Sequence, residues 1–134
     1  MADEAVIITL LGNGGDPVRY TCSNTATIEK GTLLVLSDPV TVAASAAPGG
    51  CFGGIAAHEK VANDGSTTIS AYTRGIFDIK CSQITTVGKL VSISAANVVG
   101  QATATDVENG SIVGKALETA SVSEVIAVLV GCSI

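Results

Sequence analysis

The stretch from Gly53 to Lys80 reads GGIAAHEKVANDGSTTISAYTRGIFDIK and decides the expected fold of this chain. Residues 63–65, Asn-Asp-Gly, separate two apolar segments and supply the positive φ angles that a tight hairpin turn requires. After this turn, polar and apolar residues alternate from Thr68 to Arg74. Gly75 then interrupts the alternation before a second apolar segment begins. The pattern predicts a strand, a break and a further strand.

Short strands joined by turns are also expected on both sides of this stretch. Thr, Val, Ile, Ser and Gly dominate, and no long window keeps the 3.6-residue apolar period of a helix. The best helical candidate, Ala116 to Glu124, is short. Strand-like segments lie at residues 5–10, 18–26, 32–36, 40–44, 88–93, 98–105, 112–117 and 125–130. We therefore predict an all-β fold, a small compact β-barrel or β-tulip-like domain.

Three segments of the first half recur in the second half at a nearly constant offset. Residues 31–37 are similar to 88–94, residues 54–59 to 114–118, and residues 69–75 to 125–131, at offsets of 57, 60 and 56 positions. A repeated offset of this kind indicates a duplicated β-unit. We expect pseudo-repeats at about 31–81 and 88–132, whose apolar faces pack into one barrel-like core.

The N-terminal residues are set apart from this body. The apolar segment 5–10 is followed by Gly12, Gly14 and Gly15, and such a hinge predicts a flexible N-terminal arm over residues 1–16. Residues 17–134 are then expected to form a single β-rich domain. With 47% apolar residues, a chain of 134 residues can close one core.

Charge and composition exclude several classes of function. Seven Lys and Arg against twelve Asp and Glu give a net charge of -5 without a basic cluster, which argues against nucleic-acid binding. Charged residues make up 14% of the chain, so we expect partners to cover part of the surface. The longest apolar run, Val125 to Val130, is too short to cross a bilayer, and no secretory pattern follows Met1. We expect a soluble protein that is made in the cytoplasm and binds no membrane.

The cysteines and the single histidine give no catalytic or metal-binding pattern. Cys22, Cys51, Cys81 and Cys132 are spaced by 29, 30 and 51 positions, which matches no zinc or redox motif. Reduced, buried thiols are the favoured interpretation, and disulfides would have three possible connectivities. His58 could pair with Cys51, but a surface histidine is the favoured interpretation. We expect no enzyme activity, no cofactor and no metal.

A resemblance to a known family lies within the opening stretch. Gly-Ile-Ala at 54–56, a polar turn, Ser-Thr-Thr-Ile-Ser-Ala-Tyr at 66–72 and Arg-Gly-Ile-Phe-Asp at 74–78 resemble the signature region of head decoration (cement) proteins of tailed bacteriophages, of the lambda-like type or a related duplicated family. The resemblance implies a virion structural protein on the capsid outer surface. Such proteins, usually homotrimers, stabilise the icosahedral head by bridging subunits of the major capsid protein.

The resemblance also implies a role for the arm, because the arm of such proteins typically adds a strand to a capsid β-sheet. The implied capsid-contacting residues are Ala5, Val6, Ile7, Ile8, Thr9 and Leu10. Two other classes stay open from the residues alone. A virion or cell-surface adhesion module would share a β-rich sequence without catalytic motifs, and a small enzyme or ligand carrier would need a pocket.

Overall fold

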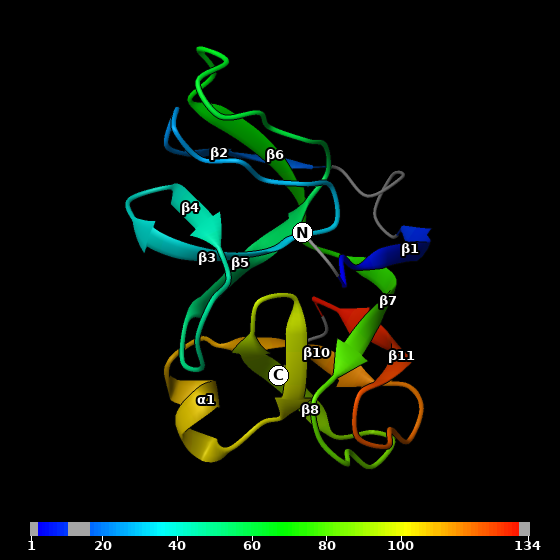
Figure 1. Ribbon diagram of the computed structural model, residues 1–134. Helices are drawn as coiled ribbons and strands as arrows, with labels where there is room; N and C mark the ends of the chain where they lie inside the picture. Colours follow the sequence, from blue (N-terminus) through cyan, green and yellow to red (C-terminus); the bar gives the residue numbers. More distant parts are fainter. Residues whose placement is uncertain (1–2, 11–16, 132–134) are drawn as a thin grey trace.

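The protein is built from two closed five-stranded β-barrels stacked one on the other (Figure 1). The computed structural model describes residues 3–10 and 17–131. Among these residues, the first barrel contains β2 (Val18–Thr21), β3 (Leu33–Asp38), β4 (Thr41–Ala44), β5 (Cys51–Ala56) and β6 (Thr68–Tyr72). The second contains β7 (Gly75–Cys81), β8 (Leu90–Ala95), β9 (Val98–Gln101), β10 (Ile112–Ala116) and β11 (Glu124–Val130). The predicted all-β fold of two similar units is confirmed.

The two barrels have the same topology. The strand order is β2-β4-β3-β5-β6 in the first and β7-β9-β8-β10-β11 in the second. In each barrel a parallel pair, β2 with β4 or β7 with β9, occupies the equivalent place, and the other pairings are antiparallel. The bridge between Ile28 and Lys60 in the first barrel has its counterpart between Thr85 and Ala120 in the second. The duplication inferred from sequence offsets is therefore a duplication of a whole barrel.

The boundary between the units differs from the one expected. Gly75 does separate two strands, but β6 closes the first barrel and β7 begins the second. The units therefore run from β2 to β6 and from β7 to β11, rather than over 31–81 and 88–132. The pseudo-repeat expected over 31–81 is wrong in including β7. Sequence shows where a strand breaks, but it does not show to which sheet the next strand hydrogen-bonds.

The expected hairpin within the opening stretch is wider than predicted. Asn63 and Gly65 adopt positive φ angles of 61° and 83°, as a turn there requires. However, β5 and β6 pair only at Ile55 with Tyr72 and at Ala56 with Ala71, so residues 57–67 form a long loop. This loop and the segment before β3 close one end of the first barrel.

The one short helix of the described residues does not lie at the best helical candidate of the sequence. Residues 116–124 contain the end of β10, a loop and the start of β11, while the short α1 (Ala104–Glu108) shortens the strand expected at 98–105. Thr103 caps α1, because its Oγ1 accepts a hydrogen bond from Asp106 N and the Asp106 carboxylate accepts one from Thr103 N. This arrangement is a capping box, which marks the start of a helix. Its sequence pattern is Thr103-x-x-Asp106, with Asp in place of the usual Glu or Gln.

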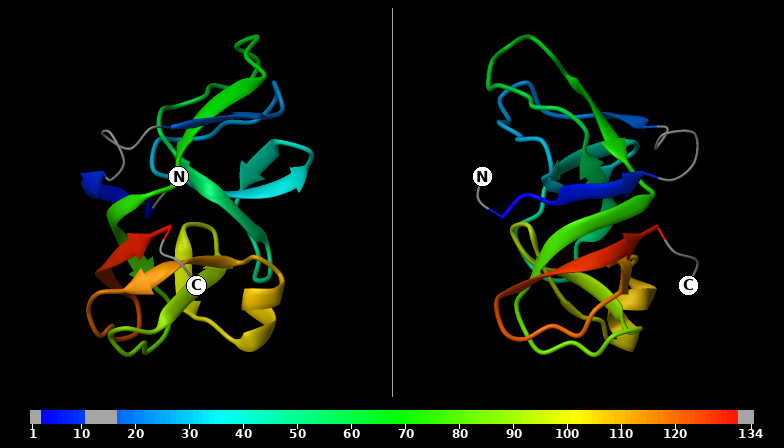
Figure 2. Two further views of the ribbon diagram at one scale, coloured as in Figure 1. Left: turned by 180° about the vertical axis from the view of Figure 1, so that it is seen from behind. Right: turned by 90° about the vertical axis from the view of Figure 1, so that its right-hand side faces the viewer.

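Buried apolar side chains of both barrels pack together at the seam. The larger apolar cluster fills the second barrel and reaches into the first through Leu33 and Ile55. A smaller cluster, which includes Ile28, Leu34 and Ile69, fills the rest of the first barrel. Figure 2 shows the barrels in contact from behind and from the side. Because apolar side chains are shared across the seam, we expect the two units to be rigid relative to each other.

Candidate interaction surface

The segment expected to form an unpaired arm is a strand of the body. β1 (Val6–Leu10) pairs antiparallel with β7, with Val6 opposite Asp78 and Ile7 opposite Phe77, and a bulge follows Ile7. The expectation of a free strand is wrong for residues 5–10, because Ala5 is only 7% exposed and Ile7 and Leu10 pack against the larger core cluster. The glycine hinge at 12–15 lies outside the described residues.

Two glycines allow β1 to approach the body closely. Ala5 N donates a hydrogen bond to Gly31 O at 2.7 Å, so the strand is tied to the first barrel as well as to β7. A Cβ atom on Gly31 would lie 2.6 Å from Ala5 O, and one on Gly75 would lie 2.6 Å from Thr9 O. Side chains at these two positions are therefore sterically excluded, and β1 spans the seam between the barrels (Figure 2).

β1 is an edge strand, because it stands at the end of the six-stranded sheet β1-β7-β11-β10-β8-β9. In the described part of the chain no further strand pairs with it. Val6 is 59% exposed and Ile8, at the bulge, is 50% exposed. An edge strand with unpaired backbone groups and exposed apolar side chains is a template for adding a strand from a partner.

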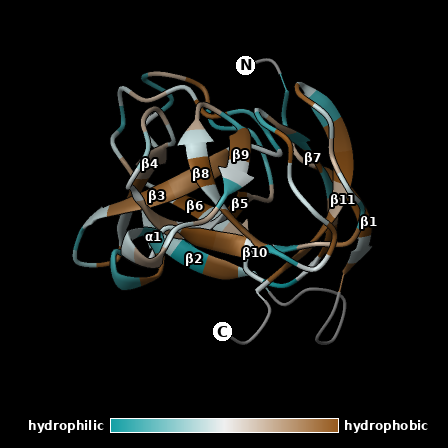
Figure 3. Ribbon diagram, turned by 90° about the horizontal axis from the view of Figure 1, so that it is seen from below, coloured by the Kyte–Doolittle hydropathy of each residue, from teal (hydrophilic) through white to brown (hydrophobic). Residues whose placement is uncertain are grey.

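The outer face of the neighbouring strands extends this apolar surface. Val6, Asp78 and Ala127 are paired in a row across β1, β7 and β11, and Lys80 is paired with the exposed Val125. Figure 3 shows the hydrophobic colouring of β11 beside β7 and β1. Lys80 Nζ forms an ion pair with Asp3 Oδ2 at 3.5 Å. The face formed by β1, β7 and β11 therefore combines apolar side chains with charges of both signs.

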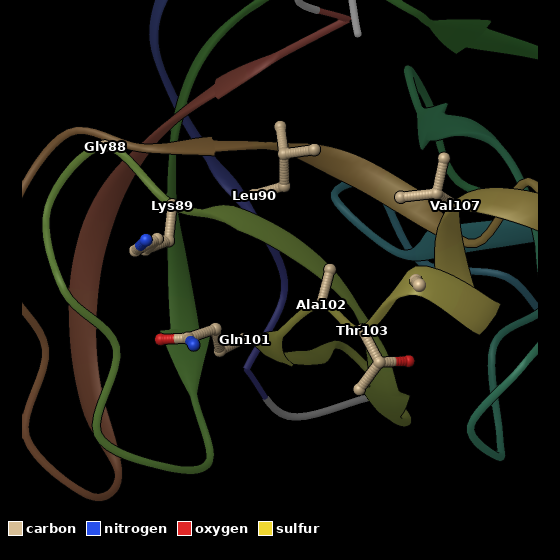
Figure 4. A pocket seen from close by; sticks show the side chains of 8 residues that line it. Gly88, Lys89, Leu90, Gln101, Ala102, Thr103 and Val107 are labelled. Atoms are coloured by element: carbon tan, nitrogen blue, oxygen red, sulfur yellow. The ribbon is translucent and has the colours of Figure 1, made fainter.

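A second feature is an open depression of about 400 Å³ beside α1. Its lining comes from the start of β8, the end of β9 and α1: Gly88, Lys89, Leu90, Gln101, Ala102, Thr103, Ala104 and Val107. In Figure 4 the polar side chains of Lys89 and Gln101 lie on one side and Val107 on the other. The depression offers an ammonium group, an amide and an apolar wall to a ligand.

Within the described residues, the structure places the histidine and three of the cysteines considered in the sequence. Both ring nitrogens of His58 contact backbone atoms: Nε2 accepts from Ser70 N at 3.2 Å and Nδ1 lies 3.1 Å from Glu59 O. Cys22, Cys51 and Cys81 are free thiols, and Cys132 lies outside the described residues. Burial raises the pKa of the Cys22 thiol, which keeps it in the unreactive protonated form.

The described residues contain neither a metal-binding cluster nor a membrane-spanning helix. Over residues 3–10 and 17–131, no group of three or more His, Cys, Asp or Glu side chains is placed to hold a metal ion. Within the same ranges, no helix is long and apolar enough to span a membrane.

The fold defines a class, a tandem of two topologically identical five-stranded barrels crossed at their seam by an N-terminal strand. A solved structure with this fold is the crystal structure of the head fiber gp8.5 N base in bacteriophage phi29, with a TM-score of 0.55 over 85% of this chain and 92% of that chain. Sequence identity is 13%, so the likeness shows a shared fold. No protein-family model and no curated protein matches the chain.

Proposed function

We propose that this protein is a structural component of a bacteriophage virion, attached to the outer surface of the head. The observation that carries the proposal is the fold shared with a head fiber base over most of both chains. The resemblance of residues 54–78 to head decoration proteins points to the same part of the virion. The two lines are independent, because one compares folds and the other compares short sequence motifs.

In this proposal the partner is the major capsid protein, and the contact is made by β1 and the outer face beside it. The sequence-derived residues Ala5 to Leu10 keep this role, although they act from a strand docked on the body and not from a free arm. A capsid strand would add to the open edge of β1, while Val6 and Ile8 would be covered. Neither partner needs to unfold for such a contact.

Bridging of capsid subunits would make the protein a cement. A ligand that binds the assembled head and not the dissociated subunits shifts the equilibrium toward assembly. We also propose that several copies, most simply a homotrimer, act together, because linked copies multiply modest individual affinities. No catalytic step is part of this function.

The test uses heads stripped of the protein and then incubated with purified variants. Val6→Lys with Ile8→Lys should abolish binding, because two charges would be placed at the covered edge. Val61→Lys is the matched control, since Val61 is equally exposed at 62% but lies far along the chain in the loop 57–67. Adding back the unmodified protein should raise the temperature at which the heads release DNA. Full binding by the double variant would refute the role of β1, and an unchanged release temperature at full occupancy would refute cementing.

Adhesion is the second candidate function, and the depression beside α1 is the observation that favours it. Its mixed polar and apolar lining is of a kind that binds sugars or short peptides. Binding of glycans or host cells that is lost in Gln101→Ala, by a protein that does not bind heads, would favour adhesion over cementing. If no such binding is found, the depression has no role in adhesion.

A further inference from the structure

A second depression, with a volume of about 140 Å³, lies at the junction of the two barrels. The connection between β4 and β5, which belongs to the first barrel, reaches down to α1 of the second (Figure 1, Figure 2). Pro48 of this connection is part of the lining. We name this site the polar depression, because the second barrel gives it mostly polar residues: Gln83, Ser92, Ser94, Gln101 and Asp106, together with Gly100.

The duplication supplies an internal comparison for the polar depression. β3 pairs with β4 in the same register, 57 positions earlier, as β8 pairs with β9. At this offset Ser94 has a polar counterpart, Ser37, but four other lining residues correspond to apolar ones: Gln83 to Ala26, Ser92 to Val35, Gly100 to Ala43 and Gln101 to Ala44. The barrel fold therefore does not require the two amides or the hydroxyl of Ser92.

Gly100 allows the amide of Gln83 to lie close to β9. A Cβ atom at position 100 would lie 3.0 Å from Gln83 Nε2 and 3.4 Å from Ser82 Oγ. Gln83 Nε2 donates to Gln101 O at 3.5 Å, a long hydrogen bond that a stronger acceptor can replace. The absence of a side chain at position 100 therefore leaves room for the amide beside the strand and brings both glutamines to one place.

The polar groups have hydrogen-bonding capacity that the described residues do not use. Asp106 Oδ2 accepts from Ser92 Oγ at 3.0 Å, whereas Asp106 Oδ1 has no partner among the described residues. The hydroxyl of Ser94 acts as an acceptor and can still donate its own hydrogen. In the same part of the chain, the Gln101 amide has no partner, and Gln83 uses only Nε2. Donors and acceptors are thus available to a ligand within one small site.

Charge and size restrict the class of ligand. Asp106 is the only charged residue of the lining among the described residues, because Lys89 lines the neighbouring depression beside α1. Hydrogen bonds from Thr103 N and Ser92 lower the pKa of Asp106, so its carboxylate is ionised at neutral pH and disfavours anions. One carboxylate is too few for a divalent cation. A volume of about 140 Å³ is also well below the roughly 300 Å³ of sites for drug-sized ligands. The ligand that fits is small, neutral and rich in hydroxyl groups.

We propose that the polar depression binds one ring of a neutral sugar. Ring hydroxyls donate to Asp106 Oδ1 and accept from the amides of Gln83 and Gln101. The exposed Pro48 offers an apolar surface to the C–H face of the ring. The inference deepens the adhesion candidate by naming a site and a ligand class, and it does not depend on attachment to heads. Because its test uses purified protein without heads, its failure and the failure of head binding are distinguishable.

The experiment is ¹H–¹⁵N NMR on the full chain, titrated to about 50 mM with the methyl glycosides of glucose, galactose, mannose and N-acetylglucosamine. Gln83 and Gln101 are the only glutamines of the chain, so their side-chain amide signals report on this site directly. At least one of these neutral glycosides should shift both signals, with a dissociation constant of about 1–10 mM. The methyl glycoside of N-acetylneuraminic acid, which carries a carboxylate, should shift neither signal.

Two variants separate the polar depression from the depression beside α1. Gln83→Met removes the amide at constant side-chain length and should weaken binding about fivefold, as followed by the Gln101 signal. Lys89→Met, in the lining of the depression beside α1, is the matched control and should bind as the unmodified protein does. Circular dichroism checks that both variants fold. No shift with any neutral glycoside, equal binding of the anionic sugar, or an equal loss in the two variants would each overturn the proposal.

Discussion

Lys60 is a buried ammonium group that holds together the loops closing the first barrel. Its side chain is 1% exposed, and its Nζ donates to the carbonyl oxygens of Asn24, Ala26 and Val61 at 3.0, 3.4 and 3.3 Å. Nζ also forms an ion pair with Asp64 Oδ1 at 3.1 Å. A buried charge is tolerated when it is paired and hydrogen-bonded, as it is here. Each of these four partners loses one hydrogen bond when the ammonium is removed.

We predict that Lys60→Met destabilises the protein by about 2 kcal/mol or more, because the hydrogen bonds of the buried ammonium to three carbonyl oxygens and its ion pair with Asp64 are lost together. The measurement is urea unfolding followed by circular dichroism. Lys30→Met, which changes an exposed lysine, is the control and should alter the free energy of unfolding by less than about 0.5 kcal/mol. Equal values for the two variants would show that the Lys60 contacts contribute nothing.

Two carboxylates make stability depend on acidity. The pKa of Asp106 is held below its ordinary value of 3.8, first by the hydrogen bond from Thr103 N and then by the hydroxyl of Ser92. The pKa of Asp64 is lowered by the hydrogen bond from Ser66 N and by Lys60. Because each folded pKa lies below the unfolded one, the stabilisation is complete above the unfolded value and is lost as pH falls through the folded value.

We therefore predict that the free energy of unfolding is constant near neutral pH and falls below about pH 4. Asp106→Asn should be less stable at pH 7 and should lose less stability between pH 4 and pH 2 than the unmodified protein. Asp38→Asn, at an exposed carboxylate, is the control and should keep the full dependence. An Asp106→Asn variant with an unchanged pH profile would contradict the role of the α1 cap.

At the scale of secondary-structure elements, two glycines offer a test of whether β1 is docked on the body or free in solution. Gly31 and Gly88 occupy equivalent positions in the two barrels and have φ angles of 89° and 88°. A Cβ on Gly31 would meet Ala5 O at 2.6 Å, whereas one on Gly88 meets nothing within 4 Å. Alanine is therefore expected to cause the same backbone strain at both positions. The two positions differ only in that a side chain at 31 would collide with the chain beside β1.

We predict that Gly31→Ala lowers the free energy of unfolding by about 1–3 kcal/mol more than Gly88→Ala does, because overpacking displaces β1. In a chain lacking residues 2–10 the two substitutions should have the same effect. That deletion should by itself lower the melting temperature by roughly 10 °C, since burial of Ala5, Ile7 and Leu10 is lost. An unchanged melting temperature would restore the view of β1 as an arm that is free in solution.

At the scale of the whole molecule, a buried asparagine connects the barrels. Asn97, in the turn between β8 and β9, is fully buried with φ 57°, and its Oδ1 accepts a hydrogen bond from Leu33 N at 2.9 Å. Asn97 N donates to Ser45 Oγ at 3.1 Å. The turn of one barrel thereby completes the hydrogen bonding of the other, which a barrel folded alone could not do.

We predict one cooperative unfolding transition for both barrels, with equal calorimetric and van't Hoff enthalpies. Asn97→Gly keeps the left-handed backbone but removes the acceptor for Leu33 N, and it should cost about 1–3 kcal/mol. Two resolved transitions in the unmodified protein would show that the shared core does not couple the units.

Local residue patterns were sufficient for much of this fold. Alternation around Thr68 to Tyr72, the break at Gly75, the positive φ angles at Asn63 and Gly65 and the repeated offsets all act over a few residues or recur at a fixed spacing. From them the sequence alone determined an all-β chain with two similar units and the place of most strands. The residues of β1 were also singled out by their apolar, β-branched composition.

Tertiary structure alone decided which strands share a barrel, because hydrogen bonding between distant strands leaves no local signal. It assigned β7 to the second unit and docked β1 on it, through close approaches that only Gly31 and Gly75 permit. It also placed the buried Lys60 among carbonyl oxygens of two separate segments of the first barrel. These features depend on contacts between residues far apart in the chain, where burial and steric fit, and not local propensity, determine the free energy.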